Sequence, residues 1–340
     1  MNVLLLLGDF GVSSVSVLLR SRHRVKCVLA CGETAAPPTD SLREVFRAKL
    51  RPVIWPGTLR PLPPDARPWL VSERLAASGI PFRYAKCHSV AELRQAISEH
   101  SIDVVLSIGY PHIIPIEPLT HVVHAGLNVH PSLLPLYRGP SPVFWQITAG
   151  EVESGITIHR ISEVVDAGPV LRQIRTVIRR EETAGELFLR LGRLAAQSIV
   201  EVLDRLEQAS LQGVAQKVGA SVQRRFHMQD AQLEWSLPAE ALARLVRACS
   251  PFPGAFTFAG GGECVRIWRA RAVPSAAAVH PGDVIARRLS NFDVGTGDGI
   301  LRVRTATSDR GSWFPTLGRP WCALRPGLRF RASAVPKGDA

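Results

Sequence analysis

The run Val3-Leu4-Leu5-Leu6-Leu7 leads into Gly8-Asp9-Phe10-Gly11 and then into a helix-like stretch from Val12 to Leu19. A short, wholly apolar run that ends in a glycine turn and is followed by a helix is typical of a buried strand in an open α/β sheet. The turn does not match Gly-x-Gly-x-x-Gly, so it gives no support for a dinucleotide site. This opening therefore predicts a doubly wound α/β domain.

Strand-like and helix-like segments continue to alternate as far as residue 207. We expect further strands at 25–30, 81–84, 103–108, 125–129 and 156–161, and helices at 70–79, 89–99 and 182–207. Residues 32–70 are rich in Pro and Arg, which favours a long surface loop with at most a short helix at 46–50. The pattern predicts a Rossmann-like domain over residues 1–210.

The pattern changes after residue 210. Residues 211–226 have the character of a linker, and a predicted helix at 238–249 follows them. Short strands separated by Gly and Pro come next, at 255–258, 265–268, 282–286, 293–295 and 300–305. Many short strands after a single helix favour a small, OB-like β-barrel, which we expect over residues 227–335.

The chain is strongly basic, with a formal net charge of +12 over 340 residues. Such a charge favours an anionic partner such as a nucleic acid. However, only five of the 41 basic residues are lysines, a bias that an arginine-rich composition would also produce. Residues 221–340 hold 17 basic and 9 acidic side chains, so most of the excess lies there. A bound anion and a merely solvated basic surface both remain open for this segment.

Cysteine usage and hydropathy indicate the cellular setting. The six cysteines form no Cys-x-x-Cys pair and no cluster with His at metal spacing, so we expect reduced structural thiols and no metal. No apolar run reaches the roughly 18 residues of a membrane span. The N-terminus lacks the basic leader and cleavage site of a signal peptide. These features predict a cytoplasmic protein.

Three polar residues, Asn128, His130 and Asp166, follow strand-like runs. The ligand crevice of an open α/β sheet lies at the carboxyl ends of its strands, where such residues would meet. An Asn amide can donate to a developing oxyanion, a His can transfer a proton, and an Asp can orient the His or hold a water. The three together predict a catalytic group that acts on an acyl carbon without a Ser or Cys nucleophile.

The segment resembles the folate-dependent formyltransferases, whose hallmark is Asn-x-His-x-Ser-Leu-Leu-Pro followed by Asp-x-Gly. Here Asn128-Val-His130-Pro-Ser-Leu-Leu-Pro135 and Asp166-Ala-Gly168 match it. The resemblance implies transfer of the formyl group of 10-formyltetrahydrofolate to a primary amine, without a metal. It implies that Asn128 and protonated His130 stabilise the oxyanion. Asp166 would hold His130 or relay a proton through water.

The resemblance also implies binding residues around this group. The folate pocket would be lined by Ile108, Gly109, Tyr110, Ser132, Leu133, Leu134, Pro135, Val164 and Val165. The acceptor would be contacted by Arg138, Gly139 and His159. For Arg138, a purely structural role in closing the turn remains open.

The acceptor is the least determined feature. Residues 227–330 resemble the C-terminal barrel of methionyl-tRNA formyltransferases, and a similar barrel follows the catalytic domain of an amino-sugar formyltransferase. Two departures from the tRNA enzymes, Cys31-Gly-Glu-Thr-Ala-Ala-Pro-Pro and His159 with Asp166-Ala-Gly-Pro169, favour a small amine. That amine would be a nucleotide-linked amino sugar or an amino-acid-derived metabolite. Initiator methionyl-tRNA is the alternative, which the basic C-terminal domain supports, and hydrolysis of formyltetrahydrofolate is a further one.

Overall fold

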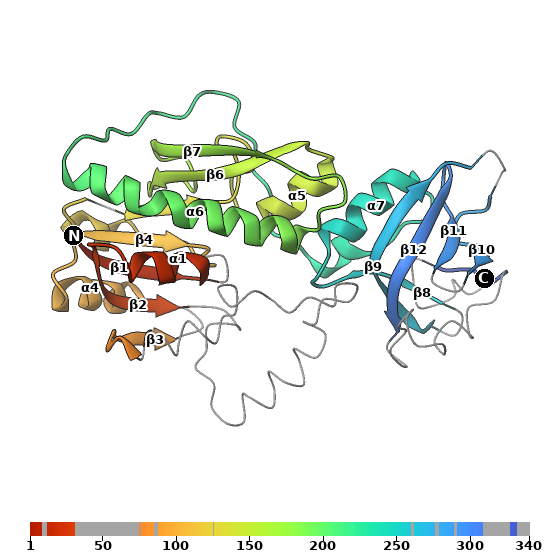
Figure 1. The fold of residues 1–340 in the computed structure, drawn as a ribbon, viewed down its shortest axis with the longest axis horizontal. Helices are drawn as coiled ribbons and strands as arrows, with labels where there is room; N and C mark the ends of the chain where they lie inside the picture. The colour runs from red at the N-terminus through yellow and green to blue at the C-terminus, as the bar shows by residue number, and fades with distance from the viewer. Residues whose placement is uncertain are drawn as a thin grey trace.

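The computed structural model describes residues 1–8, 12–30, 75, 77–84, 88–124, 126–259, 262–275, 279–288, 291–308 and 327–331. They form two domains that lie side by side along the longest axis of the molecule (Figure 1). The region 32–70 and most of the helix expected at 70–79 lie outside the described residues. No helix in the described part of the chain combines the length and apolar composition that a membrane crossing requires.

The N-terminal domain is built on a seven-stranded sheet with the order β3-β2-β1-β4-β5-β6-β7. Its strands are β1 (Asn2–Leu7), β2 (Arg24–Ala30), β3 (Phe82–Tyr84), β4 (Val104–Ile108), β5 (Gly126–His130), β6 (Glu153–Arg160) and β7 (Val170–Val177). The strands β3, β2, β1, β4 and β5 run parallel to one another. β6 pairs antiparallel with β5, and β7 pairs antiparallel with β6. The strand order reverses between β1 and β4, so the ligand crevice is expected at their carboxyl ends.

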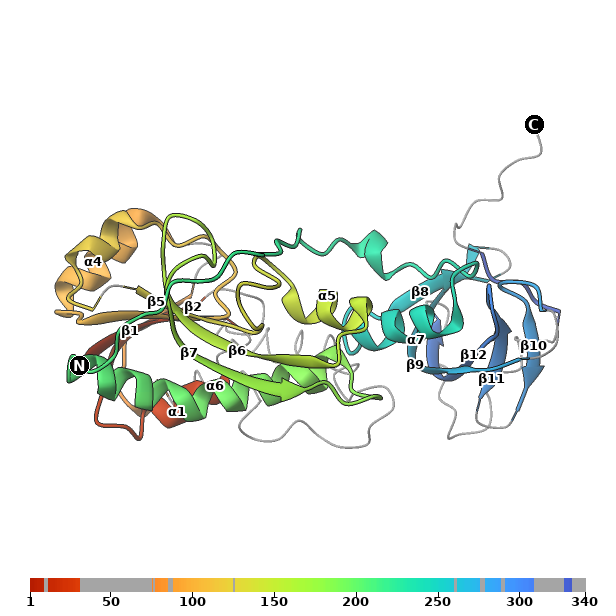
Figure 2. The same ribbon diagram turned by 90° about the horizontal axis from the view of Figure 1, so that it is seen from above.

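Helices cover both faces of this sheet. One face packs against α1 (Val12–Leu18) and α6 (Ala184–Glu207), and the other against α4 (Val90–Glu99) and the 3₁₀ helix η3 (Glu117–His121) (Figures 1 and 2). Within β1, Val3, Leu5 and Leu7 belong to the first core and Leu4 and Leu6 to the second. Burial on both sides explains why the strand is continuously apolar instead of alternating.

The doubly wound fold is confirmed, but η3, α5 (Pro142–Ala149) and β7 were not predicted. In addition, β6 begins at Glu153, three residues before the predicted start. β7 is an edge strand with exposed polar side chains on both faces, Arg172 on one and Gln173 and Arg175 on the other. An apolar pattern that weak does not separate a strand from a loop.

The C-terminal domain combines η4 (Met228–Ala231) and α7 (Ala239–Ala248) with an antiparallel sheet of order β10-β11-β12-β9-β8. The strands are β8 (Ala255–Phe258), β9 (Cys264–Val273), β10 (Val284–Arg287), β11 (Phe292–Gly295) and β12 (Ile300–Ser308). Residues 327–331 join the two edges: Arg331 N–H donates to the Phe258 carbonyl at 2.8 Å, and Val284 N–H donates to the Leu328 carbonyl at 2.8 Å. The expected small barrel is therefore confirmed.

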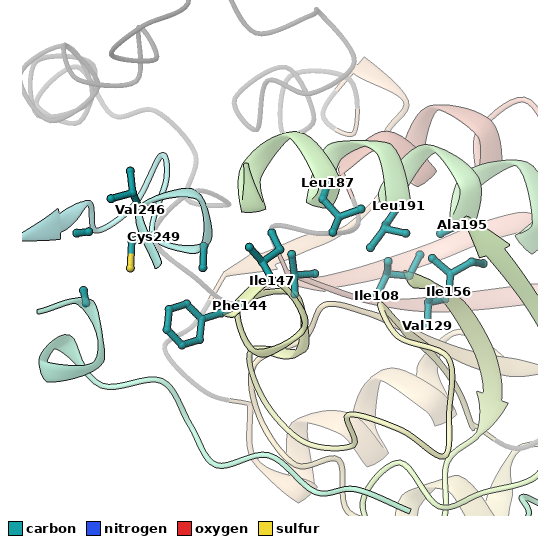
Figure 3. Close-up of a cluster of buried hydrophobic side chains, with 14 of the residues drawn as sticks. Ile108, Val129, Phe144, Ile147, Ile156, Leu187, Leu191, Ala195, Val246 and Cys249 are labelled. Carbon is teal, nitrogen blue, oxygen red and sulfur yellow. The ribbon is translucent and has the colours of Figure 1, made fainter. Parts of the chain in front are cut away.

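A continuous apolar cluster joins the two domains (Figure 3). It runs from Ile108 and Val129 in the sheet, through Phe144 of α5 (Pro142–Ala149), to Val246 and Cys249 at the end of α7. Gly185 N–H also donates to the Ser250 carbonyl across the junction at 3.0 Å. The linker after α6 runs back along the N-terminal domain past β7 before it reaches the barrel (Figure 1).

Two of the described cysteines, Cys27 and Cys249, are buried free thiols, and Cys264 is half-buried. Burial raises the pKa of Cys249 to about 12, which makes that thiol unreactive at neutral pH. Cys31, Cys87 and Cys322 lie outside the described residues. The buried thiols of Cys27 and Cys249 thus behave as small apolar side chains.

Candidate active site

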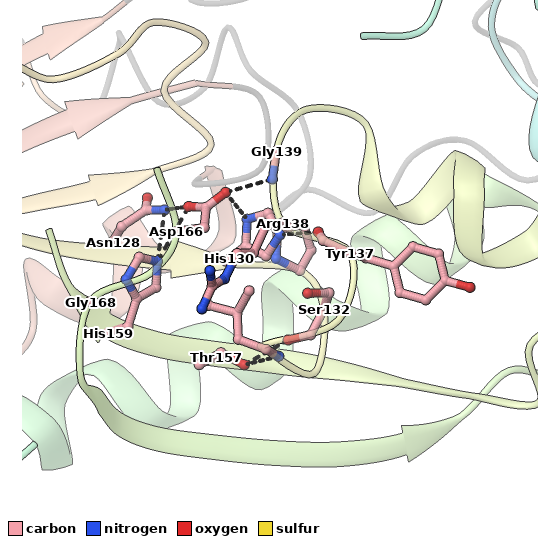
Figure 4. A network of polar contacts seen from close by, with 12 residues as sticks. Asn128, His130, Ser132, Tyr137, Arg138, Gly139, Thr157, His159, Asp166 and Gly168 are labelled. Atoms are coloured by element: carbon pink, nitrogen blue, oxygen red, sulfur yellow. Dashed lines mark hydrogen bonds and ion pairs between the residues drawn. The ribbon is translucent and has the colours of Figure 1, made fainter. Parts of the chain in front are cut away.

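Asn128, His130 and Asp166, the three predicted catalytic residues, lie together (Figure 4). Asn128 is the third residue of β5 and His130 the last, and Asp166 belongs to the loop between β6 and β7. The residues that follow the parallel neighbours β1 and β4 approach closely: a Cβ on Gly8 would lie 1.8 Å from the carbonyl oxygen of Gly109. Because β5 pairs with β4, the cluster lies beside the switch point of the sheet, where α/β domains bind ligands.

Asp166 is the centre of the network. Its Oδ2 accepts the N–H of Gly139 at 2.8 Å and lies 3.5 Å from Nδ1 of His130. Its Oδ1 accepts a hydrogen from Asn128 Nδ2 at 3.2 Å and lies 3.4 Å from Nε2 of His159. The backbone φ of Asp166 is 55°, in the left-handed region. A non-glycine residue holds that conformation only when its surroundings impose it, as these contacts do.

Glycines allow the loop that carries Asp166 and the loop that follows His130 to close. A Cβ on Gly168 would lie 1.8 Å from the carbonyl oxygen of Arg160, so the Asp166 loop can return to β6 only with glycine there. Gly139 has a φ of 91°, and its Cβ would lie 2.6 Å from the carbonyl oxygen of Gln223. The glycines of the Asp-x-Gly and Arg-Gly motifs thus have steric causes.

The two ionisable partners have shifted pKa values. Burial raises the pKa of Asp166, but the hydrogen bond with His159, the charge of His130 and the N–H of Gly139 outweigh it and lower the value to about 2. Burial lowers the pKa of His130, and this effect exceeds the opposing influence of Asp166. A carboxylate beside a neutral imidazole is therefore the favoured state of the free protein at neutral pH.

The partners of His130 fix its tautomer. Nε2 lies 2.8 Å from the backbone carbonyl oxygen of Tyr137. Because a carbonyl can only accept, Nε2 carries a hydrogen, and the lone pair of the neutral ring is on Nδ1. Nδ1 is the nitrogen that faces Asp166. His130 is therefore arranged to take up a proton at Nδ1 and to be stabilised by Asp166 once it is charged.

His159 lies behind this group and is only 2% exposed. Its Nδ1 is 2.9 Å from the carbonyl oxygen of Arg160, so that nitrogen carries a hydrogen. Its Nε2 is 3.2 Å from Asn128 Nδ2 and accepts from it when the ring is neutral. With His159 in its neutral form, both hydrogens of the Asn128 amide have acceptors, namely Asp166 and His159. Both bonds are long, so a charged oxygen can compete for either hydrogen.

The loop of residues 132–135 is held by β6 and β7. Ser132 is fully buried, and its hydroxyl donates to the Leu136 carbonyl at 2.7 Å. Thr157 donates to the Ser132 carbonyl at 2.7 Å, and Gln173 donates to the Leu134 carbonyl at 2.9 Å. Leu134 is also buried, whereas Leu133 and Pro135 are half-buried. Of the four predicted folate contacts in this loop, Ser132 and Leu134 therefore serve mainly to shape it.

The remaining predicted pocket residues flank the catalytic group. Ile108 is buried, Gly109 has a φ of 68°, and Tyr110 is half-buried with its hydroxyl 3.1 Å from His88 Nδ1. Val164 and Val165, just before Asp166, are 64% and 48% exposed. Two uncovered apolar side chains beside a buried polar cluster are suited to a flat aromatic ligand.

The linker supplies contacts that sequence reasoning missed. Arg138 donates from Nε and Nη2 to Gln216 Oε1, at 3.2 and 2.7 Å. Gln216 in turn donates to the carbonyl oxygens of Asp166 and Gly168. Arg138 thus has a structural partner, although its contact with an acceptor stays a prediction. Nothing in the composition of the exposed linker singles out Gln216 or its bonds.

A possible metal-ligand group was also not predicted. Within the described residues, His23, Asp204 and Glu207 place their ligand atoms within 4.8 Å of one another. The carboxylates already pair with cations: Glu207 with the N-terminal amine at 2.9 Å, and both acids with Arg22. His23 directly precedes the first residue of β2, at the end of the sheet away from Asn128. The group is therefore separate from the catalytic cluster.

Comparison with known proteins identifies relatives of both domains. The family described as "Formyl transferase" matches residues 66–203, and "Formyl transferase, C-terminal domain" matches residues 225–312. The methionyl-tRNA formyltransferase of Marinobacter nauticus is 34% identical over 230 residues, covering 67% of this chain and 74% of that protein. That of Chromobacterium violaceum is 36% identical over 212 residues, covering 62% and 68%.

Solved structures share the fold at lower identity. The N-formyltransferase from Helicobacter canadensis, in complex with folinic acid and dTDP-3-aminofucose, matches with a TM-score of 0.59 at 14% identity, covering 89% of this chain and 98% of that one. HypX from Aquifex aeolicus in complex with tetrahydrofolic acid matches with a TM-score of 0.55 at 21% identity, covering 68% and 40%. These likenesses support the fold of both domains.

Proposed function

Because the chain belongs to the formyl transferase family and is an enzyme of formyl transfer, we propose that it formylates the amino group of methionyl-tRNA, with 10-formyltetrahydrofolate as the donor. The observation that carries the reaction is the cluster of half-buried Asn128, buried His130 and half-buried Asp166 on β5 and the loop after β6, beside the switch point of the sheet. The acceptor is a finer inference and rests on other evidence.

Three observations support methionyl-tRNA as the acceptor. Curated relatives at 34 to 36% identity carry the name methionyl-tRNA formyltransferase. The family of their C-terminal domain matches residues 225–312 of this chain. Residues 221–340 hold 17 basic and 9 acidic side chains, a balance that suits a polyanion.

The small amine that the sequence favoured is less well supported. His159, one of the departures used for that inference, contacts Asn128 and Asp166 and is 2% exposed. Its identity therefore bears on the catalytic group more than on the acceptor. The other departure, at residues 31–38, lies outside the described residues. The sugar-formylating relatives match at 14 to 15% identity, which indicates a shared fold only.

The crevice suits a folate donor. Gly8 and Gly109 follow the ends of β1 and β4 and approach each other closely. A Cβ at Gly8 would collide with the backbone of Gly109, so this position carries no side chain that could occupy the proposed donor site. Val164 and Val165 offer exposed apolar surface at one side, and Leu133 and Pro135 are partly accessible at the other end of the network. We assign the ring system of the donor to this space, with its formyl group directed toward Asn128 and His130.

The partners of His130 suggest how the proton moves. The nitrogen of the acceptor amine forms a bond to the formyl carbon, whose double bond to oxygen opens to an oxyanion. Neutral His130 accepts the proton that the amine loses, at Nδ1, because Nε2 is committed to the Tyr137 carbonyl. Asp166 stabilises the resulting cation from 3.5 Å. His130 then returns the proton to the departing nitrogen of tetrahydrofolate when the oxyanion collapses and that carbon–nitrogen bond breaks.

Asn128 supplies a hydrogen to the oxyanion. In the free protein its Nδ2 is shared between Asp166 and His159. A charged oxygen is a stronger acceptor than a neutral imidazole nitrogen, so the hydrogen now given to His159 is the one to be exchanged. One preorganised donor of this kind typically accounts for about 10²- to 10³-fold in turnover.

The experiment is release of tetrahydrofolate from 10-formyltetrahydrofolate by wild type and Asn128→Ala. Separate reactions contain methionyl initiator tRNA, amino-sugar nucleotides, hydroxyornithine-type amines, or no acceptor. We expect release with the tRNA that is lost in the variant and weakens steeply with added salt. Release with a small amine alone would refute the proposed acceptor but keep the reaction. Release without any acceptor would identify a hydrolase.

A further inference from the structure

The linker between the domains is part of the active-site wall. Residues 214–223 are bonded at one end to β7, where the backbones of Val214 and Val170 exchange two hydrogen bonds of 2.8 Å. At the other end, Arg138 N–H donates to the Ser221 carbonyl at 2.9 Å, and Gln223 N–H donates to the Arg138 carbonyl at 2.8 Å. The segment therefore passes over the Asp166 loop and the loop that follows His130.

One side chain in this segment reaches both loops. Gln216 Nε2 donates to the carbonyl oxygen of Asp166 at 2.7 Å and to that of Gly168 at 2.8 Å. Its Oε1 accepts from two nitrogens of Arg138. Because carbonyls only accept and a guanidinium only donates, the orientation of the Gln216 amide is unambiguous. All of its strong hydrogen-bonding positions are used in holding catalytic loops.

The exposure of the segment sets Gln216 apart. Residues 212–215 and 217–220 are exposed, whereas Gln216 is half-buried. The two carbonyls that it binds lie on either side of Ala167, within the turn that holds Asp166 at a φ of 55°. A left-handed turn presents its carbonyls without strand partners, so a side-chain donor is needed to satisfy them.

We propose that Gln216 is a positioning residue for the formyl transfer reaction: it holds the backbone of Asp166 so that the carboxylate stays against His130 and Gly139. The inference rests on the proposed function for its kinetic part. Without the two donated bonds, the turn relaxes, the carboxylate leaves the Gly139 N–H, and Nδ1 of His130 loses its partner. Displacements of about 1 Å in such groups lower turnover by up to about 10²-fold.

The test compares three substitutions. Gln216→Leu removes donors and acceptor at nearly constant size. Gln216→Glu keeps oxygens for Arg138 but places an oxygen against the carbonyls of Asp166 and Gly168. Gln212→Leu is the matched control, since Gln212 is an exposed residue of the same linker. We expect kcat to fall about 10- to 100-fold in both Gln216 variants. KM for the donor should change less than kcat, because Leu133 and Pro135, at the other end of the proposed donor site, have no contact with Gln216.

A second readout needs no substrate. The amide of Gly139 is held by Asp166 Oδ2 at 2.8 Å, so its hydrogen exchange reports the position of the carboxylate. We expect it to exchange at least about tenfold faster in Gln216→Leu, approaching the rate in Asp166→Ala, and to be unchanged in Gln212→Leu. If Gln216→Leu fails to fold, Gln216→Glu decides.

Wild-type exchange of the Gly139 amide together with wild-type kcat in either Gln216 variant would overturn the proposal. In the case of Gln216→Glu, that result would mean that the hydrogen bonds to Arg138 are sufficient without the two donated to the carbonyls of Asp166 and Gly168. Wild-type protein without turnover on any acceptor would instead refute the proposed function, and the exchange of the Gly139 amide would still decide the role of Gln216.

Discussion

Nδ1 of His130 lies 3.5 Å from Oδ2 of Asp166, while Nε2 of the same ring is bonded to the backbone of Tyr137 at 2.8 Å. This arrangement leaves one nitrogen for proton transfer and places a permanent anion beside it. Burial lowers the pKa of His130 and so favours the neutral ring, and the carboxylate of Asp166 stabilises the charged ring once a proton has been taken up.

The first prediction concerns the ionisation of His130. Its pKa lies below 6.5 because burial outweighs the charge of Asp166, and the facing titratable groups are Asp166 and His159. Asp166→Asn removes the charge that raises the pKa, so the value should fall further. NMR titration of the ring C–H signals in the ligand-free protein, with the His130 signal assigned by its loss in His130→Gln, measures both values. A wild-type pKa above 6.5, or no shift in Asp166→Asn, would contradict this account.

A second prediction links Asp166 to stability. Its pKa is lowered from 3.8 to about 2, so the folded state is favoured above pH 3.8 and this advantage disappears as the pH falls toward 2. At pH 7 the shift corresponds to at most about 2.5 kcal/mol. Asp166→Asn should therefore lower the free energy of unfolding in urea at pH 7, with the difference shrinking between pH 4 and pH 2. A difference that does not depend on pH would argue against a charge effect.

Asn128→Ala should separate catalysis from folding. The side chain is half-buried and projects from the middle of β5, so its removal leaves the backbone ladder of the sheet intact, whereas turnover loses a donor to the oxyanion. We expect kcat to fall about 10²- to 10³-fold with little change in melting temperature. Asn2→Ala, at the opposite end of the sheet, is the control and should keep normal turnover. Equal losses in both variants would mean that Asn128 is only structural.

Gly168→Ala should disable the Asp166 loop through a steric clash. The new Cβ would lie 1.8 Å from the Arg160 carbonyl, a separation that forces the backbone to move. We expect activity to fall at least about tenfold, since the moved segment carries Asp166. Gly299→Ala is the matched control, because its Cβ would meet its nearest neighbour at 3.2 Å. Steady-state turnover and thermal melting of both variants provide the measurement, and full activity in Gly168→Ala would contradict the steric argument.

Much of the fold could be predicted because its signals are local. The apolar run of β1, the capped amphipathic α6 and the short strands of the barrel each follow from periodicity or turn residues. The catalytic residues were predicted from strand ends and loop motifs, and the structure brings Asn128, His130 and Asp166 together. β7 escaped prediction because it is a polar edge strand whose identity depends on its neighbour β6.

The supporting contacts could not be predicted, for a different reason. The Tyr137 carbonyl that fixes the His130 tautomer is a backbone atom, which leaves no mark in the sequence. Gln216 lies 50 residues from Asp166 in an exposed linker, and its role exists only in the folded chain. Likewise, the sequence suggested that His159 reports on the acceptor, but the structure places it beside Asn128, so it is weak evidence about the acceptor. Residue type predicted the chemistry, but not which groups hold it in place.

The path of the linker has a consequence for dissecting this protein. The last strand of the catalytic sheet ends at Val177 and α6 at Glu207, so a fragment that stops near residue 210 contains every element of the N-terminal domain. It would nevertheless lack the partner of Arg138 and the donors to the Asp166 turn. A fragment meant to be active must therefore extend through residue 223. The segment proposed to be needed for activity therefore extends to residue 223, beyond the end of α6 at Glu207.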